Sequence, residues 1–309
     1  MHPFRSLADP AVDKLRWLML ATMLVCVILT LAGQPSAFWI HPDSAIRADG
    51  LGIHDPTNHS FDFFLGCGWL AYLACSTTLI SALFLLVSVL PRWFALVLLL
   101  TVTLGDVYVG TNWLAVRWHE GTMASVDYGL GVGFPLAYVV ASTGRSSPDI
   151  NRRFRWIPVA AVLVDMSFTL AGQPAGYWAH PEMAYEGNIV SRYMLVHGWV
   201  AFLAYDVVYA LTLLLAVTAL PRITSLAVAF FFLIAHFGGA SNWLFFVWRQ
   251  GIGSVIAYAC LLSVAVVFLA FERRRLYTNT DQPATDPKVT IISEDRVTDN
   301  SESDRCRNA

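Results

Sequence analysis

Charged residues are scarce in this sequence of 309 residues, since Asp, Glu, Lys and Arg together make up 14%, against about 25% in an average soluble protein. The formal net charge is -2, and the basic residues lie in short clusters between apolar runs, which argues against a nucleic-acid partner. Hydrophobic residues make up 56% of the chain, more than one water-soluble core can bury. The composition therefore predicts that the lipid bilayer is a partner of this chain.

Cysteine is also infrequent, and familiar enzyme motifs are missing. The five cysteines show no C-x-x-C spacing, so neither a zinc site nor a disulfide framework is indicated. The sequence contains no GxSxG, GxxxxGK[ST] or HExxH motif, each of which carries a known chemistry of soluble enzymes. These absences count against a catalyst of the soluble type and leave open whether the chain is a membrane enzyme.

Eight apolar stretches are long enough, or nearly long enough, to cross a bilayer, which takes about 20 residues of helix. We predict spanning helices at residues 15–32, 63–90, 93–113, 125–141, 156–171, 193–220, 225–246 and 253–271. Pro91 and Pro221 separate neighbouring stretches, because proline ends one helix and can begin the next. The sequence thus predicts an all-α, polytopic membrane protein with eight transmembrane helices.

The connecting loops differ in their content of Lys and Arg. With the N-terminus in the cytoplasm, and counting up to Arg275, twelve of these residues fall on the inner side and four on the outer side, in agreement with the positive-inside rule. We therefore expect a multi-pass protein of the cell membrane with both its N- and C-termini in the cytoplasm.

An internal repeat relates the two halves of the chain. The residues TLAGQP at 30–35 recur letter for letter at 169–174, an offset of 139, and after the first outer loop the offset becomes 130. Ten of the eleven tryptophans have a partner in this register, for example Trp69 and Trp199. A unit with an even number of spans keeps its orientation when it is duplicated, so we predict two parallel four-helix repeats.

The repeat also sets the predicted boundaries. The first four-helix repeat covers residues 1–146 and the second covers residues 147–276. Residues 277–309 are polar and show no apolar periodicity, which predicts a disordered cytoplasmic tail. Such a tail can bind a partner, or it can simply keep that end of the chain soluble.

A first group of candidate residues lies at the predicted outer ends of the helices, where each repeat presents amide, aromatic and imidazole groups. This combination suits a small polar ligand. Glycine and proline also end helices, however, and tryptophan anchors helices at the membrane surface, so capping and anchoring is the alternative. The candidates are Gln34, Trp39, His41, Asn112, Gln173, Trp178, His180 and Asn242.

A second group lies inside the predicted spans, where an ionisable group is costly unless it faces a partner or water. At the offset of 130, Cys67 matches His197 and Asp106 matches His236. We expect the two histidines to face each other, which would allow them to bind haem or a transition metal or to relay protons; alternatively, each bonds a carbonyl or hydroxyl of a neighbouring helix. The intramembrane candidates are Cys67, Asp106, Asp165, His197, Asp206 and His236.

Three functions are compatible with these patterns. The first is binding or translocation of a small polar solute or of protons from the outer side. The second is an intramembrane haem- or metal-dependent oxidoreductase that uses His197 and His236, and the third is a membrane scaffold or sensor that acts through the tail. The sequence alone identifies neither the ligand nor a partner for Asp165.

Overall fold

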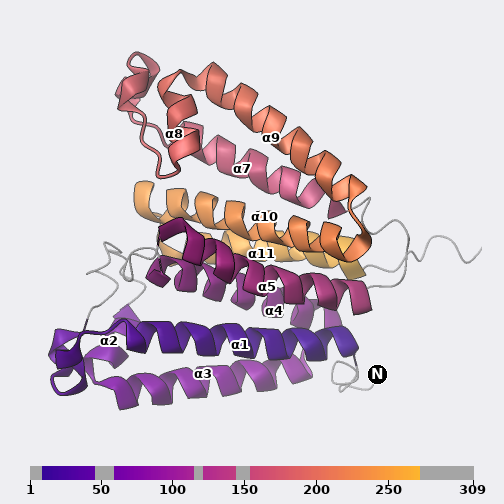
Figure 1. Ribbon diagram of the computed structural model, residues 1–309. Coiled ribbons are helices and arrows are strands. Elements are labelled where there is room, and N and C mark those ends of the chain that lie inside the picture. The colour runs from indigo at the N-terminus through magenta and orange to yellow at the C-terminus, as the bar shows by residue number, and fades with distance from the viewer. Residues whose placement is uncertain (1–8, 46–58, 115–120, 144–153, 272–309) are drawn as a thin grey trace, which may run out of the picture. The chain divides into compact units, whose positions relative to one another are not determined.

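The computed structural model describes residues 9–45, 59–114, 121–143 and 154–271 (Figure 1). In these ranges the chain forms helices and turns and no strand, so the predicted all-α fold is confirmed. The predicted tail at residues 277–309 lies outside the described residues.

The described long helices of the first half lie in the four predicted apolar stretches, and the first and last of them are longer than predicted. The first helix begins earlier than predicted because Asp9 caps it, with its Oδ1 accepting from the backbone N–H of Ala11 at 2.9 Å. Two 3-10 turns, Ser36–Trp39 and Pro42–Ser44, follow it. The helices are α1 (Pro10–Ala32), α2 (His59–Gly66), α3 (Trp69–Val89), α4 (Arg92–Asn112) and α5 (Gly121–Thr143).

The second half has the same order of elements among the described residues. Two 3-10 turns, Ala175–Trp178 and Pro181–Met183, again follow the first helix, and a π-helical turn, η8 (Trp243–Val247), extends the fourth. The helices are α7 (Trp156–Ala171), α8 (Ile189–Val196), α9 (Trp199–Ala219), α10 (Arg222–Asn242) and α11 (Gly251–Phe271).

Six of the described helices are long and apolar enough to cross a membrane: α1, α3, α4, α9, α10 with its π-helical turn, and α11. α7 is apolar but has only 16 residues. Large apolar side chains also lie on the outside of the bundle, since Leu85, Leu215 and Leu261 are 68%, 69% and 70% exposed. Water would disfavour such surfaces, whereas lipid would not, so these helices support a multi-pass membrane protein.

The predicted stretches 63–90 and 193–220 are not continuous helices. Each is broken at a glycine with a positive φ, Gly68 at 105° and Gly198 at 103°, a conformation that a residue with a side chain rarely adopts. A short helix therefore precedes each long one: α2 before α3, and α8 before α9. The sequence pattern missed both breaks because a single glycine does not interrupt an apolar run.

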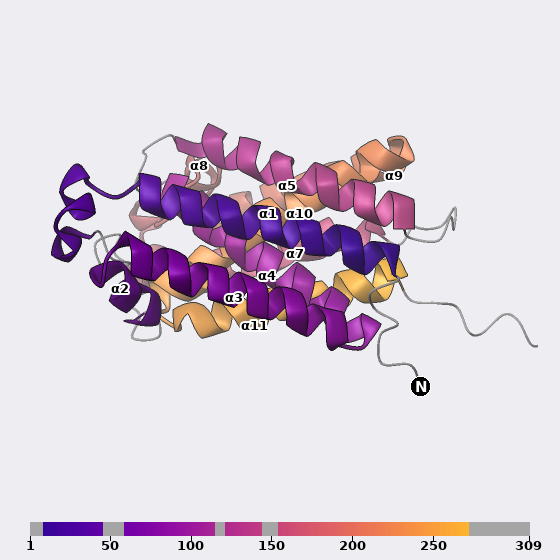
Figure 2. The same cartoon turned by 90° about the horizontal axis from the view of Figure 1, so that it is seen from below.

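Packing between the helices links residues that are far apart in the sequence. α1 packs against α4 and α7 packs against α10, while α5 packs against α10 and α11 packs against α4 (Figure 1, Figure 2). The largest apolar core joins these helices and includes Leu136 of α5 and Phe230 of α10, both 1% exposed. The contacts place α7, α9 and α10 next to one another, and this group holds the candidate site.

Candidate functional site

Two short segments that occur in both halves meet at the predicted outer ends of the helices. They are Gly-Gln-Pro at 33–35 and 172–174, and Asn-Trp-Leu at 112–114 and 242–244. A Cβ built on Gly172 would lie 2.3 Å from Cε3 of Trp243, and one built on Gly33 would lie 2.6 Å from Cζ3 of Trp113. No side chain fits in either place. Each glycine therefore provides the space in which the tryptophan of the other motif packs.

The amide of Gln173 binds backbone groups on both of its sides. Its Nε2 donates to the carbonyl of Thr169 at 3.0 Å and to that of Tyr185 at 2.8 Å, and its Oε1 accepts from the N–H of Tyr185 at 2.8 Å. This buried side chain thus fastens the loop before α8 to the end of α7. Gln34 is buried as well, and its Nε2 donates to the carbonyl of Thr30 at 3.2 Å.

The other predicted outer residues are more exposed, with the exception of Asn112. Asn112 donates from Nδ2 to the carbonyl of Tyr108 at 2.9 Å within its own helix. His180 contacts Glu182 at 3.2 Å between Nδ1 and Oε1. Four further candidates have exposed positions at this end: Trp39, His41, Trp178 and Asn242.

His236 lies at the centre of a chain of polar side chains from three helices. Its Nδ1 is 2.8 Å from Oδ2 of Asp165 on α7, and its Nε2 is 3.2 Å from the hydroxyl of Tyr209 on α9. When Asp165 is ionised, its carboxylate can only accept; Nδ1 then donates to Asp165 and Nε2 accepts from Tyr209. The imidazole of His236 can therefore accept a proton at Nε2, and the resulting imidazolium would lie against the carboxylate of Asp165.

The site lies within the helices, one or two turns from their predicted outer ends. Asp165 and His236 each stand six residues from the predicted outer ends of their helices, a rise of about 9 Å. Their side chains are 19% and 18% exposed, so both are only partly covered by the neighbouring helices. Gly239 makes this geometry possible, because a Cβ there would lie 2.6 Å from Oδ2 of Asp165.

Two further carboxyl groups, those of Asp206 and Glu186, interact electrostatically with the Asp165–His236 pair. Asp206 of α9 is 7% exposed and interacts electrostatically with Asp165, His236 and Glu186. Glu186 lies in the loop before α8, outside the spanning helices, where its Oε1 accepts from the N–H of Asn188 at 2.8 Å. Burial raises the pKa of Glu186 above its usual range, and the charge of Asp165 acts in the same direction.

The corresponding place in the first half has different chemistry. At the offsets of the sequence match, Cys26 takes the place of Asp165 and Asp106 that of His236. Thr22 donates from its hydroxyl to Oδ2 of Asp106 at 3.1 Å, and the Cys26 thiol donates to the Asp106 carbonyl oxygen at 2.8 Å. Neither partner is cationic, so only the second half joins a carboxylate to an imidazole.

His197 and Cys67 do not lie inside a long helix as the sequence suggested. Both precede the glycine breaks, and both are exposed. His197 follows the last residue of α8, with its Nδ1 2.8 Å from the carbonyl oxygen of Tyr193 and its ring 4.4 Å from that of Tyr193. His197 and His236 therefore have different partners.

A metal or haem ligand role for His236 would compete with the contacts just described. Both ring nitrogens of His236 already have partners, in Asp165 and Tyr209, so a metal bond would require one of these contacts to break. In the part of the chain that the structure describes, no three His, Cys, Asp or Glu side chains form a group that could hold a metal ion.

Sequence reasoning missed Tyr209, Glu186 and Gly239 as residues of this site. Tyrosine and glycine are ordinary in membrane helices, and Glu186 is an acidic residue in a polar loop, so none of them stands out in the sequence. The available signal for Tyr209 was its spacing of three residues from Asp206, which places both on one side of a helix.

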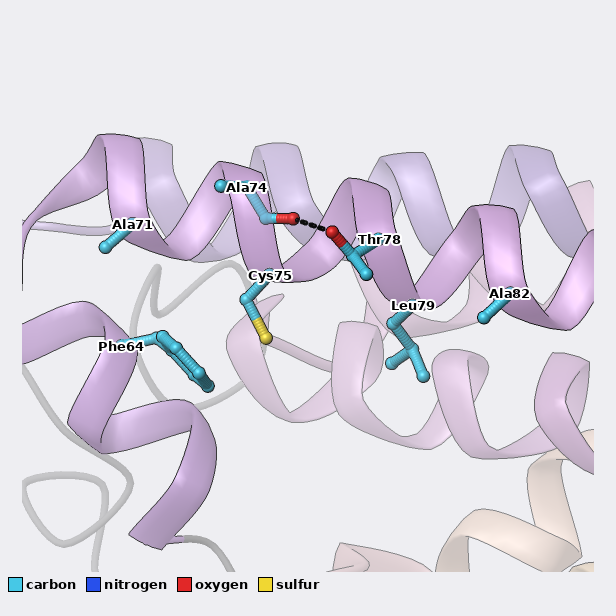
Figure 3. Close-up of a pocket in the computed structure, with 7 residues that line it drawn as sticks. All are labelled: Phe64, Ala71, Ala74, Cys75, Thr78, Leu79 and Ala82. Carbon is cyan, nitrogen blue, oxygen red and sulfur yellow. Dashed lines mark hydrogen bonds between the residues drawn. The ribbon is translucent and has the colours of Figure 1, made fainter.

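An open apolar groove of about 650 Å³ runs along α3 (Figure 3). The hydroxyl in its wall, that of Thr78, donates to the carbonyl of Ala74 at 2.7 Å. At the offset of 130, the wall residues Cys75 and Leu79 correspond to Tyr205 and Tyr209. The first half therefore has small or aliphatic side chains where the second half has the tyrosines that accompany the polar site.

Comparisons of this chain with protein-family models, with curated proteins and with solved structures gave no match.

Proposed function

We propose that the chain crosses the cell membrane eight times as two parallel four-helix repeats, with both termini in the cytoplasm. The sequence match between the halves supports this proposal, and so do the paired glycine breaks at Gly68 and Gly198. In this arrangement α5 and α7 are the two spans added to the six long apolar helices. The site at His236 then lies in the outer half of the membrane.

We further propose that the protein takes up protons from the outer side and that His236 is the proton-accepting group. The contact between His236 and Asp165 carries this proposal. Nδ1 of His236 lies 2.8 Å from Oδ2 of Asp165, and an imidazole can carry a proton on one ring nitrogen or on both while a carboxylate accepts a hydrogen bond from it. A histidine that only stabilised the bundle would not need a carboxylate partner within a membrane, where each ionisable group is costly.

Proton flux into proteoliposomes tests this function. The protein is reconstituted with a pH-sensitive dye inside the vesicles, and the external pH is lowered. We expect wild-type protein to carry protons and both His236→Gln and Asp165→Asn to slow the flux by about a hundredfold, the low end of what a positioned proton-transfer group contributes.

Two control variants separate this site from the other candidates. His197→Ala changes an exposed histidine outside the chain of contacts, and Asp106→Asn changes the corresponding position of the first half; both should keep the flux. Loss of flux in His197→Ala as well as in His236→Gln would favour the histidine pair. No flux from wild-type protein, or a visible haem absorption band that His236→Ala removes, would contradict the proposal.

A further inference from the structure

We infer that Asp206 is a second proton-binding carboxyl group of the same site, which receives the proton from His236 through the hydroxyl of Tyr209. This inference rests on the proposed function and extends it from a single proton-accepting group to a relay with two ends. The proton receiver would then be a residue of α9, whereas Asp165 belongs to α7 and His236 to α10.

The first observation is that Asp206 is buried and that one of its carboxylate oxygens, Oδ2, has no hydrogen-bond partner in the described part of the chain. Asp206 is 7% exposed, and among the described residues its buried Oδ2 has no hydrogen-bonding group within reach. Burying a charged carboxylate oxygen without a hydrogen bond costs more free energy than burying an unpaired neutral polar group. A proton on Asp206 removes that charge, so the site favours proton binding at this oxygen.

The second observation is the position of Asp206 relative to Tyr209. The two residues are three apart in α9, so their side chains lie on one side of the helix, one turn from each other. They also interact electrostatically. The hydroxyl of Tyr209 also contacts Nε2 of His236 at 3.2 Å, so this tyrosine touches the imidazole and shares a side of α9 with the second carboxyl group.

The third observation concerns the titratable side chains that the elements next to α9 place around Asp206. α7 contributes Asp165, α10 contributes His236, and the loop before α8 contributes Glu186. On α9 itself the neighbours are Tyr205 and Tyr209. α8 carries two further titratable side chains, Arg192 and Tyr193, both of which are exposed.

Three carboxyl groups thus share one imidazole. If all four were charged, the site would carry a net charge of about -2 in a medium of low dielectric constant. Binding of protons reduces this charge. The first half has no such surplus, because the position that corresponds to Asp206 at the offset of 130 is Ser76.

The transfer itself balances without any other reactant. Oδ2 of Asp206 has no hydrogen-bond partner among the residues that the structure describes, so a side-chain rotation in α9 first brings it within reach of the Tyr209 hydroxyl. Protonated His236 then gives its Nε2 proton to the oxygen of Tyr209, while the O–H of Tyr209 gives its own proton to Oδ2 of Asp206. The imidazole returns to its neutral form, the tyrosine is unchanged, and Asp206 becomes neutral. Rotation of the tyrosine hydroxyl then restores the starting arrangement.

Two variants of Asp206 test the inference in the same proteoliposome assay. Asp206→Asn keeps the shape but cannot take a proton, and Asp206→Ser places there the residue found at the matching position of the first half. Both should lower the flux by about a hundredfold, and Asp206→Glu should restore part of it. Asp127→Asn, at an exposed position of α5, should leave the flux unchanged.

A second measurement does not depend on flux. Infrared difference spectra of the folded protein between acidic and alkaline pH should contain a carboxyl band that disappears in Asp206→Asn and remains in Asp127→Asn. If His236→Gln stops the flux while both Asp206→Asn and Asp206→Ser keep it and the infrared band, the proposed function stands and the role of Asp206 is wrong. If wild-type protein carries no protons, the proposed function itself fails.

Discussion

The carboxylate of Asp165 lies against the backbone of α10 at Gly239, where a Cβ would be 2.6 Å from Oδ2. The contact leaves no room for a methyl group at this position. Gly239→Ala should therefore push the carboxylate away from His236 and cost about 2 kcal/mol, the value of a hydrogen bond to a charged group. Thermal unfolding in detergent measures the change.

The neighbouring glycine provides the matched control. A Cβ on Gly238 meets nothing within 4 Å, so Gly238→Ala should be neutral or should stabilise α10 by up to about 1 kcal/mol through helix propensity. Equal effects of the two substitutions would show that Gly239 does not position Asp165.

The contact between Gly172 and Trp243 predicts a second destabilised variant. Gly172→Ala places a Cβ 2.3 Å from the indole ring, so the ends of α7 and α10 must separate, at a cost of about 1 to 3 kcal/mol for overpacking. Adding Trp243→Phe, which reduces the ring, should recover part of this loss. A double variant no more stable than Gly172→Ala would mean that the clash is not the cause.

The raised pKa of Glu186 predicts how the stability of the folded state depends on pH. The folded state binds the Glu186 proton more tightly than the unfolded state, so this residue stabilises the fold most at low pH, and the contribution is lost as pH rises through the folded pKa. Glu186→Gln should flatten this part of the stability curve. Glu182→Gln, at an exposed acid nearby, should leave it unchanged; identical curves for wild type and Glu186→Gln would contradict the assignment.

The proposed topology depends on α7, whose 16 residues rise by about 24 Å, less than the roughly 30 Å of a hydrocarbon core. If α7 crosses the membrane with the help of flanking residues, a reporter fused at Arg152 should lie in the cytoplasm and one at His180 outside. Reporters in the same compartment would remove α7 from the set of spans. The outer location of the site would then be wrong.

The sequence predicted the ends of most helices closely, because apolar runs and prolines act locally. α7 has the predicted bounds of 156–171, and Pro91 and Pro221 separate helices as expected. The sequence-based prediction was wrong at Gly68 and Gly198, where a single glycine with a positive φ interrupts the helix inside an apolar run. Since His197 directly precedes the second of these breaks, its predicted place inside a spanning helix was also wrong.

What the sequence by itself determined is a helical chain with several apolar spans and a few ionisable residues among them, because hydrophobicity and helix formation depend on neighbouring residues. The tertiary structure decided which of those residues meet. Asp165 and His236 are 71 residues apart, and their contact depends on how α7 packs against α10 and on the space left by Gly239. Such a contact leaves no periodic signal in one sequence, so only the packed helices identify the partner of His236.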